Sequence, residues 1–185
     1  MRIVGGAWRG RRLVAPPGAI TRPTADRVRQ ALFDMLWHAP WGGRGCIEGA
    51  EVLDAFAGTG ALGLEALSRG AARASFLEAD RVALLALQAN IAACGAADRC
   101  TVLAGDALTP PPAARACQLV FLDPPYGQGW VRLGVTRLRA GGWIGPETLI
   151  IAETGRDEAA PTATPLSDRA HGAARLWVWR ETEGA

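Results

Sequence analysis

Short apolar runs separated by glycine-rich or polar turns occur along most of the chain. Such runs predict buried strands, whereas stretches with an apolar residue every three or four positions predict helices. We expect strands at residues 51–56, 74–78, 101–104, 119–122, 149–153 and 175–179, and helices at residues 62–68, 81–94 and 130–139. This alternation predicts an α/β fold with a mostly parallel central sheet and helices on both faces, in which the last strand could be an antiparallel addition.

The first forty residues follow a different pattern. Glycines between two short apolar stretches predict a hairpin over residues 2–14, and the prolines that follow end it. An apolar stripe at helical spacing predicts an amphipathic helix over residues 25–37, with Thr24 as its N-cap. We therefore divide the chain into an N-terminal extension, residues 1–40, and a main domain, residues 41–185.

The formal net charge of +2 hides an asymmetry along the chain. Residues 1–30 hold seven arginines against one aspartate, a net charge of +6, which leaves −4 for the rest. Clustered arginine favours contacts with nucleic-acid phosphates, which weaken as salt rises. Trp8 lies among these residues and could stack on a base or pack against its own hairpin. The candidate nucleic-acid-binding residues are Arg2, Trp8, Arg9, Arg11, Arg12, Arg22, Arg27 and Arg29.

The remaining composition excludes several classes of protein. The 185 residues, of which 49% are hydrophobic, predict a compact globule. No apolar segment is long enough to cross a bilayer and no leader pattern opens the chain, so we expect a cytoplasmic protein. The four cysteines have no close spacing and no neighbouring histidine, which argues against a zinc site or a disulfide framework, and we expect no metal.

A glycine turn joins the predicted strand 51–56 to the helix that follows. Gly58 and Gly60 permit a tight turn and close approach of a ligand to the backbone, and the helix start supplies oriented N–H groups. Glu78 ends the next strand twenty residues after Gly58, where an acid can accept hydrogen bonds from ribose hydroxyls. These features fit a dinucleotide and S-adenosylmethionine equally well.

Three observations favour S-adenosylmethionine. Asp54 lies where a carboxylate suits the ammonium group of that ligand and would repel a pyrophosphate. Asp106 follows another strand and could reach an adenine amine, although a turn residue that binds its own backbone is nearly as good an interpretation. A dehydrogenase also needs a substrate domain, for which too little chain remains. The candidate cofactor-binding residues are Asp54, Phe56, Gly58, Gly60, Glu78, Ala79, Asp106, Ala107 and Asp123.

The sequence Asp123-Pro124-Pro125-Tyr126 directly follows the apolar run 119–122. The prolines hold this corner extended and leave carbonyl groups outside the strand ladder. The Asp123 carboxylate and the Pro124 carbonyl could accept hydrogen bonds from an exocyclic base amine, and Tyr126 could stack on the base. These four residues are the candidate catalytic group. The alternative is a plain loop after a core strand, with Tyr126 packed inward.

With these motifs in this order, the chain resembles class I S-adenosylmethionine-dependent amino-methyltransferases. The blocks Arg2–Arg11, Arg22–Arg29 and Phe56–Gly70 are similar, more narrowly, to bacterial 16S rRNA guanine-N2 methyltransferases of the RsmD type. The resemblance implies a Rossmann-like fold and methyl transfer from S-adenosylmethionine to the N2 amine of one guanine. It also implies 16S rRNA or the small ribosomal subunit as partner, with arginines of the extension on the RNA backbone. The sequence is silent on oligomeric state, and a monomer is the default expectation.

Three other functions remain open from the sequence. One is a noncatalytic RNA-binding module, against which the complete set of methyl-transfer motifs argues. A DNA adenine-N6 or cytosine-N4 methyltransferase uses the same acid-proline-proline-aromatic chemistry, but generally carries a sizeable target-recognition domain. A nicotinamide-dependent oxidoreductase would use the same glycine turn, and it would be distinguished by tight binding of NADH in place of S-adenosylhomocysteine.

Overall fold

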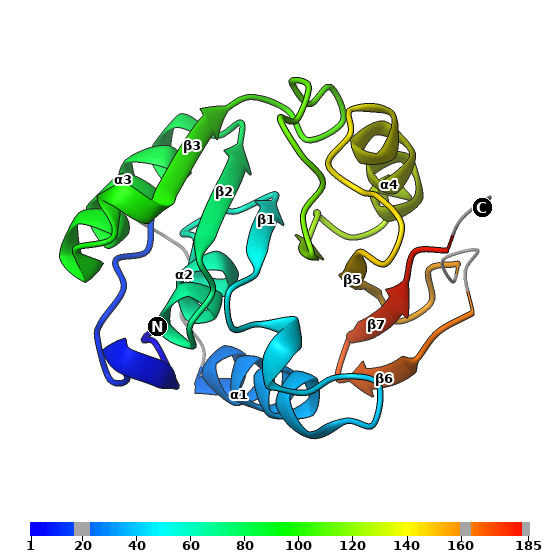
Figure 1. Cartoon of the computed structure of the whole chain (residues 1–185), viewed down its shortest axis with the longest axis horizontal. Helices are drawn as coiled ribbons and strands as arrows, with labels where there is room; N and C mark the ends of the chain where they lie inside the picture. The colour runs from blue at the N-terminus through cyan, green and yellow to red at the C-terminus, as the bar shows by residue number, and fades with distance from the viewer. Residues whose placement is uncertain (17–22, 160–163, 183–185) are drawn as a thin grey trace.

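The computed structural model describes residues 1–16, 23–159 and 164–182, which build a sheet of seven strands (Figure 1). The strand order is β3-β2-β1-β4-β5-β7-β6. The first five strands pair in parallel, whereas β7 is antiparallel to both β5 and β6. The predicted α/β class is confirmed, including the antiparallel addition. The bounds are β1 Glu51–Ala55, β2 Arg73–Glu78, β3 Cys100–Ala104, β4 Leu119–Leu122, β5 Leu149–Gly155, β6 Ser167–His171 and β7 Ala174–Arg180.

Helices cover both faces of the sheet because successive strand residues point to opposite sides. The helices are α1 Pro23–His38, α2 Ala61–Ser68, α3 Arg81–Cys94 and α4 Trp130–Ala140. Helices α1, α2 and α3 pack with one set of strand residues, which includes Phe76 and Phe121. Helix α4 packs with the alternate set, which includes Leu77 and Val120, and it lies apart from the other helices (Figure 1). Each of the two cores is therefore formed by alternate residues of the same strands.

Two details at the N-terminus differ from the prediction. The arms of the hairpin over residues 2–14 pair through one antiparallel bridge, Arg2 with Arg12, and through backbone hydrogen bonds on both sides of it, but they form no regular strands, and the middle is a short 3-10 helix, Gly6–Trp8. Helix α1 begins at Pro23, so Thr24 lies inside the helix and is not its N-cap. Proline suits a first helical position because its missing N–H has no partner there.

The N-terminal hairpin is attached to α2 through a buried carboxylate. Glu65 is 0% exposed and accepts hydrogen bonds from the Val4 amide at 2.8 Å and from Arg69 Nε at 2.8 Å. Arg29 of α1, itself buried, places Nε 3.7 Å from the same carboxylate. One acid of the main domain thus joins the hairpin, α1 and α2.

A serine one turn later completes this attachment. Ser68 Oγ donates to the Gly5 carbonyl at 2.6 Å and accepts from the Trp8 amide at 2.9 Å. Ile3 and Leu13 of the hairpin are buried in the same core as α2. The Phe56–Gly70 block of the sequence therefore contains a binding surface for the hairpin as well as the glycine turn.

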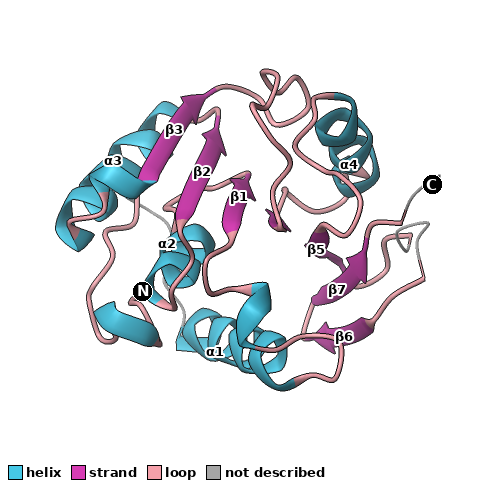
Figure 2. Cartoon of the chain, in the orientation of Figure 1, coloured by secondary structure: helices cyan, strands magenta, loops and turns pink. Residues whose placement is uncertain are grey.

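The sequence reasoning missed one strand, β6, which pairs with β7 at the edge of the sheet beside α1 (Figure 2). Its residues, Ser167 to His171, have no apolar alternation and are partly or fully exposed. An edge strand with one free side needs no buried face, and polar side chains there hinder pairing with other chains. None of the helices in the described part of the chain has the length and apolar composition needed to span a membrane.

Candidate active site

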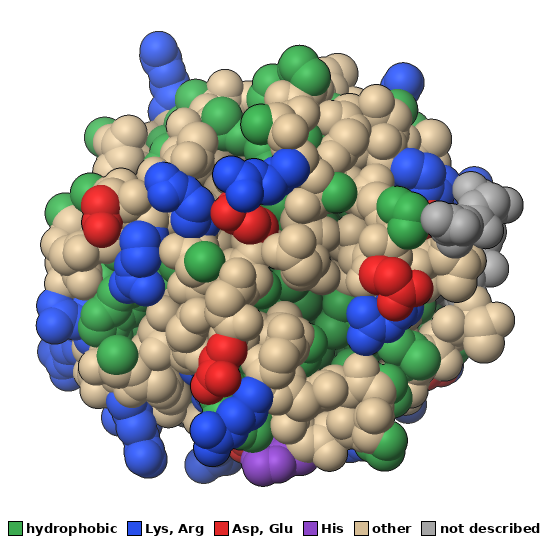
Figure 3. All heavy atoms as spheres, viewed as in Figure 1, with side chains coloured by type: hydrophobic (Ala, Val, Ile, Leu, Met, Phe, Trp, Pro, Cys, Tyr) green, Lys and Arg blue, Asp and Glu red, His purple; other side chains and the backbone are tan. Residues whose placement is uncertain are grey.

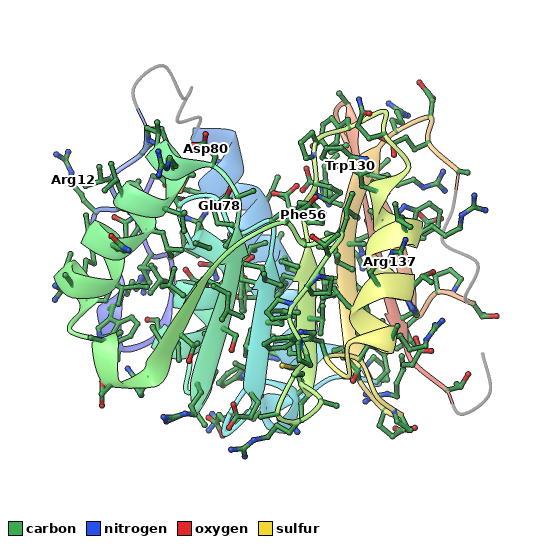
Figure 4. All side chains as sticks on the ribbon, turned by 90° about the horizontal axis from the view of Figure 1, so that it is seen from above. Arg12, Phe56, Glu78, Asp80, Trp130 and Arg137 are labelled. Carbon is green, nitrogen blue, oxygen red and sulfur yellow. The ribbon has the colours of Figure 1, made fainter. Side chains whose placement is uncertain are left out.

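Two cavities open along the carboxyl edge of the parallel strands, and they share Phe56 and Asp123. The first, about 550 Å³, is lined by Glu78, Ala79, Asp106 and Ala107, among others. The second, about 600 Å³, is lined by the glycine turn and by residues of α1, β5 and the β6–β7 hairpin. Both volumes lie in the range of small-molecule sites. Figure 4 shows Glu78, Phe56 and Trp130 along this same edge.

Glu78 is held by backbone N–H groups at the end of β2. Its Oε2 accepts from the Gly58 amide at 2.6 Å, and its Oε1 accepts from the Asp80 amide at 2.7 Å. A carboxylate has about four acceptor positions, so both oxygens keep capacity for a further donor. Asp80 is the N-cap of α3, because its side chain accepts from the Ala83 amide at 2.7 Å. The acid expected to contact a ribose is therefore fixed in place beside the glycine turn.

The glycine turn contains two unusual backbone positions. Gly60 has φ 76°, and a Cβ there would lie 2.4 Å from Leu87 Cδ1, so only glycine fits. Phe56 has φ 63° although it is not glycine, a conformation that costs roughly 1–3 kcal/mol. Its ring stacks on Trp130, with centroids 6.1 Å apart and planes 13° from parallel. The strained backbone places an aromatic ring where the two cavities meet.

Asp54 lies under the start of α2. Its Oδ2 accepts from the Gly63 amide at 2.8 Å, and the side chain is buried on the wall of the second cavity. Burial raises the pKa of Asp54 to about 8; the hydrogen bond from Gly63 opposes this, and the carboxylates of Asp123 and Glu78 add to it. Asp54 and Asp123 both line the second cavity, and two carboxylates on one wall favour a cation there.

Asp106 fits both of the interpretations that the sequence left open. Its Oδ1 accepts from the Leu108 amide at 2.8 Å, which is the turn that satisfies its own backbone. The residue also lines the first cavity together with Ala107. The turn bond uses one oxygen, so an acceptor remains for a ligand amine.

The Asp123-Pro124-Pro125-Tyr126 corner leaves β4 at its carboxyl end and lines the first cavity. Tyr126 is 46% exposed, so it is not packed inward as the alternative interpretation required. Its hydroxyl donates to Glu153 Oε1. Desolvation by the surrounding protein, and then the nearby Glu153 carboxylate, raise the pKa of Asp123. Asp123 is nevertheless exposed to the cavity, so water there screens part of this effect.

A second acid supports the loop behind Tyr126. Glu158 Oε1 accepts from the Gly127 amide and, at 3.1 Å, from the Gly155 amide. The end of β5 and the loop after β4 are thereby connected, which fixes the position from which Tyr126 extends.

Glu153 and Trp130 are site residues that the sequence reasoning missed. Glu153 follows the apolar part of β5 as Asp123 follows β4, and the register pairs Leu122 with Ala152, so the two acids come next on neighbouring strands. That parallel was the available signal for Glu153. Trp130, as the first residue of α4, gave no comparable signal.

The structure separates the candidate RNA-binding residues into exposed arginines and residues that are packed into the fold. Arg2, Arg9, Arg11, Arg12 and Arg27 are exposed, and Figure 3 shows arginine side chains along the side where Figure 1 places α3 and the N-terminal hairpin. Arg29 is 5% exposed and binds Asp26 at 2.8 Å, so it stabilises the fold and is removed from the set. Trp8 packs on the core beneath the guanidinium of Arg99. Arg22 lies outside the described residues.

The site offers carboxylates, backbone N–H groups and aromatic faces around a pair of connected cavities. No cluster of histidine, cysteine, aspartate or glutamate that could hold a metal ion occurs within residues 1–16, 23–159 and 164–182. The arrangement suits binding of a cationic nucleoside and of a base amine next to it.

The family model described as "Conserved hypothetical protein 95" matches residues 1–180. The chain is 40% identical over 162 residues to the ribosomal RNA small subunit methyltransferase D of Escherichia coli (strain K12), covering 88% of this chain and 78% of that protein. The solved structure of the Escherichia coli protein yhhF superposes with a TM-score of 0.81 at 35% identity, over 98% of each chain.

A more distant structure shows the same fold. An RNA methyltransferase from Salinibacter ruber, solved in complex with S-adenosyl-L-homocysteine, has a TM-score of 0.63 at 17% identity and covers 90% of this chain and 96% of its own. The expected Rossmann-like methyltransferase fold is confirmed. The chain belongs to the Conserved hypothetical protein 95 family, which includes the ribosomal RNA small subunit methyltransferase D proteins.

Proposed function

We propose that this protein transfers a methyl group from S-adenosylmethionine to the exocyclic N2 amine of one guanine in 16S rRNA, as free RNA or in the small ribosomal subunit. The observation that carries the proposal is the meeting of two cavities at Phe56 and Asp123. One cavity has the groups that an adenosine needs, and the other leaves room for a base beside the shared acid. The family membership supports RNA as the substrate class.

The residues around the first cavity fit the cofactor. Glu78 would hold the ribose hydroxyls, and Asp106 would accept from the adenine amine, with Ala79 and Ala107 against the ring. Asp54 lines the second cavity, so it would face the ammonium group of a methionine chain that extends there past Phe56; that positive charge favours the ionised acid despite its raised pKa. When bound, S-adenosylmethionine supplies a methyl carbon made electrophilic by its sulfonium.

The chain's own contribution is to hold the amine and accept its charge. The lone pair of a guanine N2 amine is delocalised into the ring, so hydrogen bonds to the Asp123 carboxylate and the Pro124 carbonyl would help draw it out. As the nitrogen gains the methyl group it loses a proton, and Asp123 would be placed to accept that proton because it already holds the amine. The raised pKa of Asp123 makes it a better base than an ordinary aspartate. Tyr126 would stack on the base, and positioning supplies much of the rate.

The exposed arginines of the N-terminal extension would hold the RNA backbone around the target. The base must leave any pairing partner to enter a cavity, at a cost of a few kcal/mol. A groove of about 520 Å³ between the hairpin and α1, lined in part by Arg2, Arg9 and Arg27, is a candidate path for that backbone. Residues 1–40 would thus act as the RNA-facing part of the molecule.

Incubation with methyl-labelled S-adenosylmethionine tests the proposal. The substrates are small subunits and rRNA from cells that lack this protein, with duplex and single-stranded DNA as controls, and labelled nucleosides are identified by mass spectrometry. We expect one N2-methylguanosine per 16S rRNA, and no product from Asp123→Ala, which should still bind S-adenosylhomocysteine. Label in adenine or cytosine of DNA, or none in RNA, would refute it.

A further inference from the structure

Glu153, a carboxylate of the second cavity close to the shared Asp123, has no role in the mechanism above. It lies within β5, directly after Ala152, which pairs with Leu122 just before Asp123, and it lines the second cavity. Tyr126 donates to its Oε1. Within the described residues no protein donor is bound to Oε2, so this oxygen is available to a ligand.

Two neighbouring acceptors distinguish guanine from the other bases with exocyclic amines. On its Watson–Crick edge guanine presents two adjacent donors, the N1–H and the N2 amine. Adenine and cytosine present an amine next to a ring nitrogen that is itself an acceptor. An ionised carboxylate only accepts hydrogen bonds, so it pairs with N1–H and repels a ring-nitrogen lone pair.

We infer that Glu153 is a specificity-determining residue that accepts the guanine N1–H while Asp123 holds the N2 amine. This inference rests on the proposed function and extends it to the choice of base. The spacing is consistent with it, because neighbouring strands lie about 4.8 Å apart and the two acids each follow a member of the Leu122–Ala152 pair. The hydrogen bond from Tyr126 keeps the Glu153 carboxylate at this place and links it to the ring expected to stack on the same base.

The test compares two target bases and three proteins. Once the target nucleotide is mapped, an RNA fragment or reconstituted subunit is made with guanosine or with 2-aminopurine at that position. 2-Aminopurine keeps the 2-amine but has an acceptor at N1. Rates of methyl transfer are measured for the wild type, for Glu153→Gln and for Glu158→Gln.

Glutamine at position 153 keeps an acceptor for Tyr126 and adds an N–H donor, which suits the N1 of 2-aminopurine. We expect the guanine to 2-aminopurine ratio of kcat/KM to fall at least about tenfold in Glu153→Gln, since a site built to bind an N–H rejects an analogue without it. Glu158→Gln removes a carboxylate that lines neither cavity and should keep the wild-type ratio. Equal binding of S-adenosylhomocysteine by all three proteins checks that the fold is intact.

An unchanged ratio in Glu153→Gln, with guanine methylated by the wild type, would overturn the inference and leave the proposed function standing. The same holds if both variants lower the ratio equally, because loop geometry would then be the cause. Failure of the wild type to methylate any RNA guanine would instead remove the proposed function, and the inference with it.

Discussion

Replacing Glu65 by alanine should destabilise the protein more than any exposed substitution. The side chain is 0% exposed and connects three parts of the molecule: the hairpin through the Val4 amide, α1 through Arg29, and its own helix through Arg69. The two guanidinium groups are themselves 5% and 9% exposed. Removal of the acid would leave the Val4 amide without its acceptor, and would leave the two buried cations only their more exposed partners, Asp26 for Arg29 and Asp34 for Arg69.

The expected loss is about 3–5 kcal/mol, the range found when one member of a buried ion pair is removed. The lost hydrogen bond from the Val4 amide lies within that figure and is not added to it, because the contributions are coupled. Urea unfolding followed by circular dichroism and by tryptophan fluorescence gives the free energy, and coincident curves check for two-state behaviour.

Asp34→Asn is the matched control, because Asp34 contacts the same Arg69 at 3.7 Å but is 51% exposed. Its loss should stay below about 1 kcal/mol. Glu65→Gln, which keeps an acceptor for Val4, separates the charge from the hydrogen bond. If Glu65→Ala cost less than about 1 kcal/mol, the idea that this acid attaches the N-terminal extension would be wrong.

Three further predictions concern binding and pH. Glu78→Ala should weaken S-adenosylhomocysteine binding by about 1.5–3 kcal/mol in isothermal titration, as expected for hydrogen bonds to a charged group; unchanged affinity would remove Glu78 from the ribose site. The double variant Arg9→Gln, Arg12→Gln should lower rRNA affinity and flatten its salt dependence without changing cofactor affinity. An unaltered salt dependence would count against RNA binding by the N-terminal extension. Because burial raises the pKa of Asp54 from 3.8 to about 8, the folded state retains a proton that the unfolded state releases. Stability should therefore fall as pH rises from about 4 towards 8, and unfolding curves of Asp54→Asn should lack that part of the decline.

The sequence predicted the parallel part of the fold well, because a buried strand such as β4 is a continuous apolar run between turn residues. It failed where burial gives no signal. Strand β6 is polar and exposed, and it is a strand only because its backbone pairs with β7, which its sequence pattern does not show. The hairpin was overestimated because a local glycine pattern does not show that residues 6–8 form a helical turn.

Individual site residues were predictable to the extent that their role is local. Glu78 and Asp80 follow from their positions at a strand end and a helix start. Arg29 could not be distinguished from its exposed neighbours, because its burial depends on Glu65, 36 positions away in the chain. Glu153 likewise becomes a site residue only through the pairing of β5 with β4.

The left-handed backbone of Phe56 has a consequence for attempts to engineer this protein. Glycine at this position would relax the backbone at the expense of the ring and its stacking on Trp130. A search for thermostable variants would therefore tend to remove the Phe56 ring, which lies between the cavity proposed for the cofactor and the cavity proposed for the base. Gains in melting temperature obtained here should be accompanied by loss of turnover, a trade-off frequent where function keeps a residue in an unfavourable conformation.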